Sequence, residues 1–477
     1  MVFSSPLFIY VFCPIFFIAF FLVPGKMKDF IIISASIFFY AWGTNYFILI
    51  VFATCVMDYK LGALIHAARE NPEKTKLLKL YIFIDVFVNL AILLYFKYTN
   101  FFIDNANSLF EILNHDKILF PKVILPIGIS FVIFQKMTYC LDISRGKVNP
   151  AEHFFVFIEY LLLFPQIIAG PILKYNELAP QFKNKDISPD NIEAGFRKFS
   201  VGLFKKVIIA DTVAKYADFV FNGPAGAIPI HYTWIGLVCY TLQIYFDFSA
   251  YSDMAIGMLK VMGFTIPENF NSPYISISIT EFWKRWHISL TSWMREYIYI
   301  PLGGNRKGLP RMYFNLWIVF LISGFWHGAS WNFVVWGIYH GSLLCFERLV
   351  LLKRMERLSS FIRLVLNLFL VMIGWVFFRT ENMAHAFDYL RQLFNFSSIA
   401  IHTPPDRIMS IDNFGKFIIL LAIFVCILPF FDNFHNKLLK TAAGHPKINL
   451  FLCFILLYIS MIKVGTASFS PFIYFRF

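Results

Sequence analysis

The chain has 477 residues, of which 58% are hydrophobic and 15% charged, and it contains 60 phenylalanines. Ordinary globular proteins are about 45–50% apolar and about 25% charged, so this balance excludes a soluble enzyme, a disordered chain and a collagen-like fibre. The 42 Lys and Arg residues exceed the 29 Asp and Glu residues, which gives a formal charge of +13. The Lys and Arg bias of cytoplasmic membrane loops explains this excess more simply than nucleic-acid binding does.

Apolar stretches of about 17 residues or more are long enough to cross a membrane, and they recur along the chain. The candidate spans are residues 7–23, 30–57, 79–102, 119–141, 152–172, 200–221, 230–262, 313–346, 361–378, 416–431 and 448–465. The run 30–57 contains a break at 42–44, and the run 313–346 contains a glycine-rich break at 324–329 that can turn a hairpin. At about 20 residues per span, we predict an all-α polytopic membrane protein with about 11–13 membrane segments, some of them re-entrant or interfacial.

The first apolar run, 7–23, lacks the basic segment of a secretory signal, and residues 24–26 do not form a small-residue cleavage site. We therefore expect a retained helix. The seven cysteines lie within or beside apolar stretches and include no C-x-x-C pair. Neither a disulfide framework nor a zinc site is predicted. No repeat of fixed period is evident, so we treat residues 1–477 as a single membrane domain.

Basic connections between the apolar runs predict the orientation. They comprise residues 59–79, 183–206, 305–311, 347–363 and 437–447. Because Lys and Arg near span ends favour the cytoplasm, we place these segments there. Loop 379–415 and the C-terminus then lie on the extracytoplasmic side. Lys26 and Lys28 also favour the cytoplasm, which requires residues 30–57 to cross twice or to dip in and return.

Ionisable residues inside apolar runs are informative, because each costs roughly 2.5–3.5 kcal/mol at the centre of a membrane helix and must face protein or water. In the run 230–262, Gln243, Asp247 and Tyr251 recur every four residues on one helix face. Asp253 follows Asp247 about a turn and a half later. Two interpretations stay open: a functional one, as a polar wall of a cavity or a partner for a nearby histidine or arginine, and a structural one, as bonds between helices.

Residues 280–297 have the pattern of an amphipathic helix at the membrane interface, with Thr280 as its N-cap. One side carries Trp283, His287, Leu290 and Met294, and another carries Glu281, Lys284, Thr291 and Arg295. The pattern is typical of a plain interfacial anchor, and it is equally compatible with a helix whose histidine is functional. The Gly-rich basic turn 301–308 follows and contains Asn305 and Arg306. Such turns can hold phosphate through backbone N–H groups, but the spacing is not that of a P-loop.

A third cluster of polar residues lies in the apolar run 313–346. His327 and His340 are flanked by glycines and tryptophans, and glycine lets another backbone or a ligand approach closely. The spacing contains no H-E-x-x-H pattern, so we predict no metal. Burial keeps an imidazole neutral, and a neutral imidazole can take the proton of a hydroxyl that attacks an acyl carbon.

Together these motifs resemble the membrane-bound O-acyltransferases (MBOAT), and within them the bacterial alginate and peptidoglycan O-acetyltransferases and the D-alanyl transfer proteins. The resemblance rests on Leu125–Phe131, Phe164–Gln166, Ala169–Pro171, Pro180–Phe182, Asp247–Asp253, Phe282–His287, Tyr299–Arg306 and Gly324–Gly328. The motif-dense core is thus about 120–345, and residues 1–115 and 380–465 match mainly in hydropathy. The ending Phe472–Phe477 is similar to the aromatic C-terminus of this branch, with Arg476 in place of a glutamine-like residue.

The resemblance implies a ring of tilted helices around a thinned centre, with a central tunnel that brings a cytoplasmic acyl donor to an acceptor on the far side. His327 matches the invariant catalytic histidine of the family, and His287 matches the second histidine of this branch. We expect transfer of an acetyl group from a cytoplasmic donor, acetyl-CoA, to a hydroxyl of an exported partner or of a cell-surface polysaccharide. His327 is expected to act as general base, with an acyl-histidine intermediate as the alternative.

Further residues receive supporting roles. His287 would position or stabilise the donor thioester, and Trp283 and Trp286 would shape the tunnel. Donor attraction or plain anchoring is expected of Lys284, Arg285, Arg295, Asn305 and Arg306. Supporting positions around the site are Asp247, Asp253, Asn332 and His340. We expect no bound cofactor and no metal, a periplasmic SGNH-type partner, no nucleic acid, and a place in the bacterial cytoplasmic membrane.

Two other functions stay open. D-alanyl transfer from a carrier protein to teichoic acid is disfavoured by length, because proteins of that branch tend to be shorter. A proton-coupled transporter or flippase would use intramembrane Asp and His as a relay, and it predicts paired broken helices in two related halves. A purely structural scaffold would leave the Trp–His–Gly arrangement unexplained. The sequence leaves the acceptor and the oligomeric state open.

Overall fold

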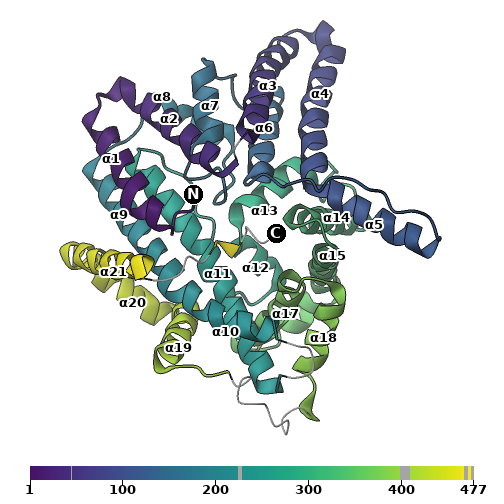
Figure 1. The fold of residues 1–477 in the computed structure, drawn as a ribbon, viewed down its shortest axis with the longest axis vertical. Coiled ribbons are helices and arrows are strands. Elements are labelled where there is room, and N and C mark those ends of the chain that lie inside the picture. Colours follow the sequence, from purple (N-terminus) through teal and green to yellow (C-terminus); the bar gives the residue numbers. More distant parts are fainter. Residues whose placement is uncertain (45, 224–227, 398–408, 467–470, 474–477) are drawn as a thin grey trace. The chain divides into compact units, whose positions relative to one another are not determined.

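The computed structural model describes residues 1–44, 46–223, 228–397, 409–466 and 471–473, and no β-strand occurs within these ranges. Helices make up 77% of the structure, which confirms the all-α prediction. The chain forms two compact units. Figure 1 labels the helices along the chain. Unit 1 comprises Met1–Phe199 and Met254–Pro267, and unit 2 comprises Ser200–Asp253 and Glu268–Phe477. The single domain over 1–477 stays a prediction.

Unit 1 contains the N-terminal helices. They are η1 (Phe8–Phe12), α1 (Cys13–Leu22), α2 (Gly25–Thr44), α3 (Phe47–Arg69), η2 (Pro72–Lys74), α4 (Thr75–Leu93), η3 (Leu94–Tyr98), α5 (Thr99–Ile112), α6 (Ile129–Ser144), α7 (Phe154–Leu162), α8 (Tyr175–Lys183) and most of α9 (Pro189–Phe204). Helices α3, α4 and α6 pack against one another. The break predicted at 42–44 is confirmed, because α2 ends at Thr44 and α3 begins at Phe47. Helix α3 also continues through the first half of the predicted loop 59–79.

Nearly every side chain of α6 is buried. The helix begins after Gly128, whose φ of 78° is left-handed. A Cβ atom at this position would lie 2.5 Å from the Ile167 carbonyl oxygen. Only glycine tolerates both conditions at low cost, which explains why the sequence places glycine directly before this helix.

Unit 2 contains the remaining helices. They are η4 (Lys205–Ala210), α10 (Asp211–Phe221), most of α11 (Ile230–Val261), η5 (Pro273–Ile275), α12 (Ile279–Arg285), α13 (Ile288–Met294), η6 (Arg295–Tyr299), α14 (Leu309–His327), α15 (Trp331–Phe346), η7 (Glu347–Leu351), α16 (Leu352–Met355), α17 (Ser360–Arg379), α18 (Met383–Leu393), α19 (Asn413–Ile427), η10 (Leu428–Phe430), α20 (Asp432–Ala443) and α21 (Pro446–Thr466). Residues 398–408 of the predicted outer loop, and residues 474–477 of the C-terminus, lie outside the described residues.

The predicted hairpin in the run 313–346 is confirmed, since α14 ends at His327 and α15 begins at Trp331. The two helices pack closely along their length. A Cβ atom at Gly324 would lie 2.2 Å from the Phe333 carbonyl oxygen, and one at Gly337 would lie 2.5 Å from the Phe320 carbonyl oxygen. Glycines therefore let the two backbones approach closely, as in other membrane helix pairs.

Six helices of the described chain are long and apolar enough to span a membrane: Phe47–Arg69, Pro72–Ile112, Trp331–Val350, Ser360–Arg379, Asn413–Phe430 and Pro446–Thr466. The protein is thus a multi-pass membrane protein, but these six do not confirm the predicted count of about 11–13 segments. The run 152–172 shows why. Only α7 is helical there, and Leu163, Phe164 and Ile167 beyond it are fully buried. These residues are apolar because they lie in the protein interior, where irregular backbone is tolerated.

Candidate functional site

His287 lies at a break between two short helices, so the prediction of one continuous amphipathic helix is wrong. Helix α12 ends at Arg285 and α13 begins at Ile288. His287 between them has φ 44° and ψ 55°, the left-handed conformation. This conformation costs of order 1–3 kcal/mol for a residue with a side chain and persists only where the surroundings hold it. The break moves the His287 side chain off the stripe that 3.6-residue periodicity predicted.

Asn269 holds the break in place. Its carbonyl oxygen accepts a hydrogen bond from Ile288 N at 2.9 Å. Its side-chain Oδ1 accepts from Ser289 N at 3.2 Å and from Ser289 Oγ at 2.8 Å, and lies 3.2 Å from His287 Nδ1. Its Nδ2 donates to Ser252 Oγ at 3.1 Å. The sequence analysis missed Asn269, because an asparagine in a loop carries no hydropathy signal and meets His287 only after folding.

The contacts of Asn269 define the protonation state of His287. Because Oδ1 is an acceptor only, the Nδ1 of His287 carries the hydrogen and the neutral ring leaves Nε2 as an acceptor. Burial lowers the pKa of His287 to about 3. The imidazole is therefore neutral near pH 7, and its chemistry is that of a hydrogen-bond acceptor at Nε2.

Unit 2 places His287 and His327 around one indole ring. The centroid of Trp326 lies 6.2 Å from that of His287 and 5.0 Å from that of His327. His327 is 5% exposed and packs against Trp336 and Phe378, both at 5.1 Å between centroids. The structure thus brings the two predicted histidines together within an aromatic environment. Their catalytic roles stay predictions.

His340 lies beyond Trp336, on α15. Its centroid is 4.9 Å from that of Trp336 and 5.0 Å from that of Trp283. The side chain is fully buried, and neither ring nitrogen has a hydrogen-bond partner in the described part of the chain. A Cβ atom at Gly374 would lie 2.5 Å from His340 Nε2, so the ring fills its space tightly. His340 connects Trp283 with the surroundings of His327.

A pocket of about 550 Å³ opens beside Trp283. Its lining includes the cations Lys284, Arg295 and Arg348, and apolar side chains such as Leu290, Met294 and Phe320. Ser323, one helical turn before His327 on α14, also lines it. Pockets of this size that combine apolar walls with a few charged groups bind small molecules, and here the charges favour an anionic end. The sequence analysis predicted Lys284 and Arg295 but missed Arg348.

Trp283 is positioned by the capping of α12. The carboxylate of Glu347 accepts hydrogen bonds from Ile279 N at 2.5 Å and from Thr280 N at 3.1 Å. The N-cap is Ser278, whose Oγ accepts from Glu281 N, and the prediction of Thr280 as N-cap is therefore wrong. A carboxylate at a helix N-terminus satisfies free N–H groups and complements the helix dipole. Glu347 lies 5% exposed and was also missed by the sequence analysis.

Other predicted residues do not line this pocket. Arg285 pairs with Glu281 at 2.9 Å, Trp286 packs against Trp375 at 4.9 Å between centroids, and Asn332 donates to the Thr380 carbonyl at 2.7 Å. Asn305 and Arg306 lie in the exposed turn after η6. These contacts and exposures are those of structural or surface residues. The roles in binding predicted for these five residues stay predictions.

The carboxylates of α11 take part in ion pairs. Asp247 lies 2.8 Å from Lys206 Nζ, and Asp253 lies 2.6 Å from Lys205 Nζ. Of the two open interpretations, the contacts favour structural bonds over a cavity wall. Asp247 also accepts a hydrogen bond from Ile473 N at 2.7 Å.

Through that bond the C-terminal residues 471–473 reach the surroundings of His287. Phe472 is 1% exposed and stacks on Tyr251 at 4.8 Å between centroids. It also lies 5.9 Å from Phe248, which contacts His287 edge-on at 4.7 Å. The sequence analysis noted the aromatic ending but predicted no contact between it and His287.

Comparison with known proteins gives a consistent assignment. The family model for MBOAT, the membrane-bound O-acyltransferase family, matches residues 147–381. A probable alginate O-acetylase of Pseudomonas putida is 37% identical over 100% of both chains. A peptidoglycan O-acetyltransferase of Helicobacter pylori is 36% identical over 84% of this chain and 81% of that protein. A teichoic acid D-alanyltransferase of Bacillus subtilis is 29% identical over 46% of this chain and 58% of that protein.

Proposed function

The chain belongs to the membrane-bound O-acyltransferase family, and from this premise we propose that it transfers an acetyl group. The donor is cytoplasmic acetyl-CoA. The acceptor is a hydroxyl of a cell-surface polysaccharide of the alginate or peptidoglycan type, or of an exported partner protein. One observation carries the proposal: a cation-rimmed apolar pocket adjoins the aromatic cluster that holds His327 and His287. The two O-acetyl-transferring relatives named above match this chain over most of its length, and the D-alanyltransferase covers less than half of it.

The pocket provides a site for the donor. Lys284, Arg295 and Arg348 would attract the phosphates of the donor, since clustered cations raise the local concentration of an anionic ligand. The apolar wall would hold the pantetheine arm and the acetyl group. Ser323 lines the pocket one turn before His327, so a thioester that reaches Ser323 approaches the C-terminal end of α14.

In the proposed reaction, His327 takes the proton of the acceptor hydroxyl as its oxygen attacks the thioester carbon. A C–O bond forms, the C–S bond breaks, and the thiolate of coenzyme A takes the proton back from His327. The products are an ester and free coenzyme A, with no net change in protons. General-base catalysis of this kind contributes about 10²–10⁴-fold to a rate. Attack by His327 itself, with an acyl-histidine intermediate, is the alternative.

The protonation state of His287 favours a role on the hydroxyl side. A neutral ring whose Nδ1–H is bound to Asn269 presents an acceptor at Nε2. An acceptor can orient a hydroxyl donor, but it cannot stabilise the negative charge that develops on the thioester oxygen. We therefore assign His287 to positioning the acceptor hydroxyl, which differs from the thioester role predicted from the sequence.

The proposal includes the cellular setting. The enzyme would lie in the bacterial cytoplasmic membrane with its C-terminus on the extracytoplasmic side, and an SGNH-type periplasmic protein would pass the acetyl group on. An adjacent gene for such a protein would support the relay. D-alanyl transfer stays the second candidate, and turnover of acetyl-CoA compared with an aminoacylated carrier protein separates the two.

The central test measures acetyl transfer by purified protein in proteoliposomes with labelled acetyl-CoA. We expect His327→Ala to lower the rate by about 10²-fold or more. His231→Ala is the matched control, because His231 is an exposed histidine of the same unit. Full activity in a folded, inserted His327→Ala protein would refute the assignment of the base.

A further inference from the structure

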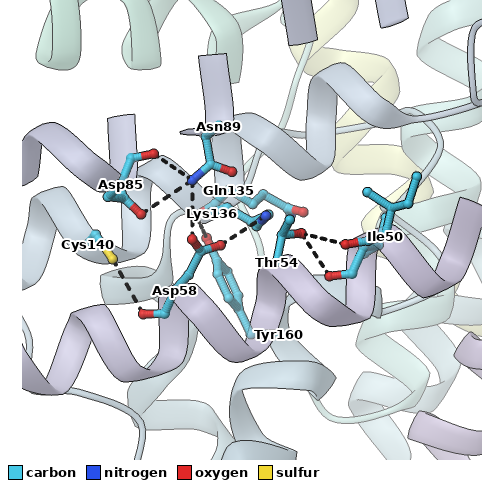
Figure 2. Close-up of polar contacts among 10 residues, drawn as sticks. Ile50, Thr54, Asp58, Asp85, Asn89, Gln135, Lys136, Cys140 and Tyr160 are labelled. Carbon is cyan, nitrogen blue, oxygen red and sulfur yellow. Dashed lines mark hydrogen bonds and ion pairs between the residues drawn. The ribbon is translucent and has the colours of Figure 1, made fainter. Parts of the chain in front are cut away.

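Unit 1 contains a buried polar cluster that the proposed acyl transfer does not use. It is formed by Asp58 on α3, Asp85 and Asn89 on α4, and Lys136 on α6 (Figure 2). Each of these side chains is at most 1% exposed. Helix α3 and the α4 stretch are both candidate membrane spans, and Asp58 is the middle residue of α3. The sequence analysis did not identify this cluster, although Asp85 and Asn89 stand four residues apart within the apolar run 79–102.

The carboxyl groups of Asp58 and Asp85 are connected through one amide. Asn89 Nδ2 lies 3.3 Å from Oδ1 of Asp58 and 3.3 Å from Oδ1 of Asp85, and donates to the Asp85 carbonyl at 2.9 Å. Lys136 Nζ lies 3.0 Å from Asp58 Oδ2. Figure 2 shows the four side chains converging from three helices. The two carboxyl groups therefore share one amide donor, and Lys136 pairs with Asp58.

The charges of the cluster do not balance. Two carboxylates and one ammonium leave one excess negative charge if all three are ionised. An uncompensated charge in a protein interior is strongly unfavourable, and a buried group neutralises by changing its protonation state instead. Helices α3 and α4 are also candidate membrane spans, and in a membrane ionisable groups must be paired or neutral.

Three oxygen acceptors in and beside the cluster lack a hydrogen-bond donor, whereas Lys136 Nζ and Asp58 Oδ2 form the ion pair. Asp85 Oδ2, Asn89 Oδ1 and Gln135 Oε1 are buried, and no hydrogen-bond donor reaches them from the described residues. All three side chains are at most 1% exposed. Buried polar atoms are nearly always paired in native structures, so unpaired oxygens call for an explanation. The cluster therefore lacks hydrogen-bond donors and, if all three groups are ionised, one positive charge.

We propose that this cluster is a proton-binding site, in which Asp85 carries one exchangeable proton and Asp58 forms an ion pair with Lys136. Hydronium supplies the proton, so that the Asp85 carboxylate becomes a neutral carboxyl group and one water is released. The bound proton removes the excess negative charge and turns one acceptor oxygen of Asp85 into a donor.

A proton fits this site better than a metal ion. Lys136 already occupies the anionic side of Asp58, and the Asn89 N–H groups point at both carboxyl groups, where they would repel a cation. Within the described chain, no three His, Cys, Asp or Glu side chains gather to hold a metal ion. The cluster also lies outside residues 147–381, which match the family model, and the inference does not depend on acyl transfer.

Proton binding has a consequence for stability. An unfolded chain releases the Asp proton near pH 3.9, whereas the folded protein retains it to higher pH. The stabilisation is therefore present at acidic pH and is lost as the pH rises far enough to remove the proton. Three titratable groups beside Asp85 affect this loss: Asp58 on α3, and Lys136 and Cys140 on α6. Tyr160 on α7 donates to the Gln135 carbonyl at 3.3 Å and is the next titratable group.

The test compares infrared spectra of the purified full-length protein in H₂O and D₂O. A protonated carboxyl group has a carbonyl stretch that is separate from that of a carboxylate and shifts on deuteration. We expect this band in the wild type, its loss in Asp85→Asn, and an increase in Lys136→Met, because both carboxyl groups then need a proton. Asp116→Asn, an exposed residue of the same unit, is the control and should leave the band unchanged. Melting temperatures should fall at alkaline pH in the wild type but not in Asp85→Asn.

Two results would overturn the proposal. One is an identical carboxyl band in the wild type and Asp85→Asn. The other is a stabilisation of the wild type by Na⁺ over choline that Asp85→Asn abolishes, which would make the site a metal-ion site. If Asp85→Asn does not fold, the carbonyl band of the wild type is followed in an alkaline titration instead. An exchangeable proton is refuted if this band never disappears as the pH rises, or if it is absent from the start. Acetyl transfer at neutral pH should be retained by Asp85→Asn, so this test is independent of the proposed function.

Discussion

The carboxyl groups of unit 1 and the histidines of unit 2 are buried to a similar degree, but different interactions stabilise them in the protein interior. Asp58 and Asp85 are fully buried, and His287 and His327 are 1% and 5% exposed. The carboxyl groups are stabilised by Lys136 and by Asn89, from neighbouring helices. The histidines lie among aromatic rings, His287 as a neutral acceptor, with cations of unit 2 lining the nearby pocket. A buried group that must react stays uncharged, whereas a buried charge needs a partner.

The largest stability effect should come from breaking a buried ion pair in unit 2. Lys206 Nζ lies 2.8 Å from Asp247 and 2.9 Å from Asp211. Lys206→Met leaves Asp247 as an uncompensated buried charge, and we expect a loss of about 3–5 kcal/mol in the free energy of unfolding. Thermal unfolding in detergent measures it.

The control for this loss is Arg391→Met. Arg391 and Asp388 form an exposed pair at 3.9 Å, and exposed pairs contribute about 0–1 kcal/mol. Equal losses in both variants would contradict the assumption that burial decides the strength of these pairs.

The next effect concerns the positioning of His287. Asn269→Ala removes the acceptor of His287 Nδ1–H and of Ser289, which should cost about 1–3 kcal/mol. If about 1.4 kcal/mol of this positioning is lost from the transition state, the rate of acetyl transfer falls about tenfold. Asn271→Ala is the matched control. The backbone N–H of Asn271 donates to the Arg285 carbonyl and its backbone carbonyl accepts from Arg285 Nη1, so alanine keeps both hydrogen bonds. A normal rate in Asn269→Ala would show that the break at His287 needs no support.

A smaller effect is expected at the rim of the pocket. Arg348→Ala should raise the KM for acetyl-CoA severalfold at low salt, with kcat nearly unchanged, because a rim cation attracts the donor without touching the reacting bond. The difference should shrink at high ionic strength. Arg354→Ala, an exposed arginine outside the pocket lining, should leave KM unchanged. A change in kcat alone would instead place Arg348 in the chemical step.

A last effect concerns the pH dependence of stability and appears only below neutral pH. Because burial lowers the pKa of His287 to about 3, the folded protein binds no proton there above about pH 4. The unfolded chain binds one below about pH 6.5, so the free energy of unfolding should decrease as the pH falls from about 6.5 towards 3. His287→Gln should weaken this decrease, as a pH series of melting temperatures can measure. A steeper decrease in the variant would contradict a neutral His287.

Local signals in the sequence predicted several features correctly. Hydropathy and run length predicted an all-α membrane protein, and the glycines at 324–329 predicted the α14–α15 hairpin. The motifs around His287 and His327 predicted the family. These features follow from the composition of short segments, and solvent and backbone sterics act on each segment directly.

Other features depend on residues that meet only after folding. The periodicity of 280–294 predicted one helix, but Asn269 breaks it at His287 from a loop. Run length alone counted the buried segment after α7 as part of a span. Arg348 and Glu347 reach the site from η7, far along the chain from Trp283.

The sequence by itself therefore determined the lipid solvent and the helical class and predicted the two histidines, because each of these depends on a contiguous segment. The tertiary structure decided how those residues are held: which nitrogen of His287 carries the hydrogen, where the pocket beside Trp283 opens, and that two aspartates share one asparagine in unit 1. These properties arise from pairs of groups distant in sequence, whose energies depend on distance and burial. Periodicity and composition contain no information on the distance between such groups or on their burial.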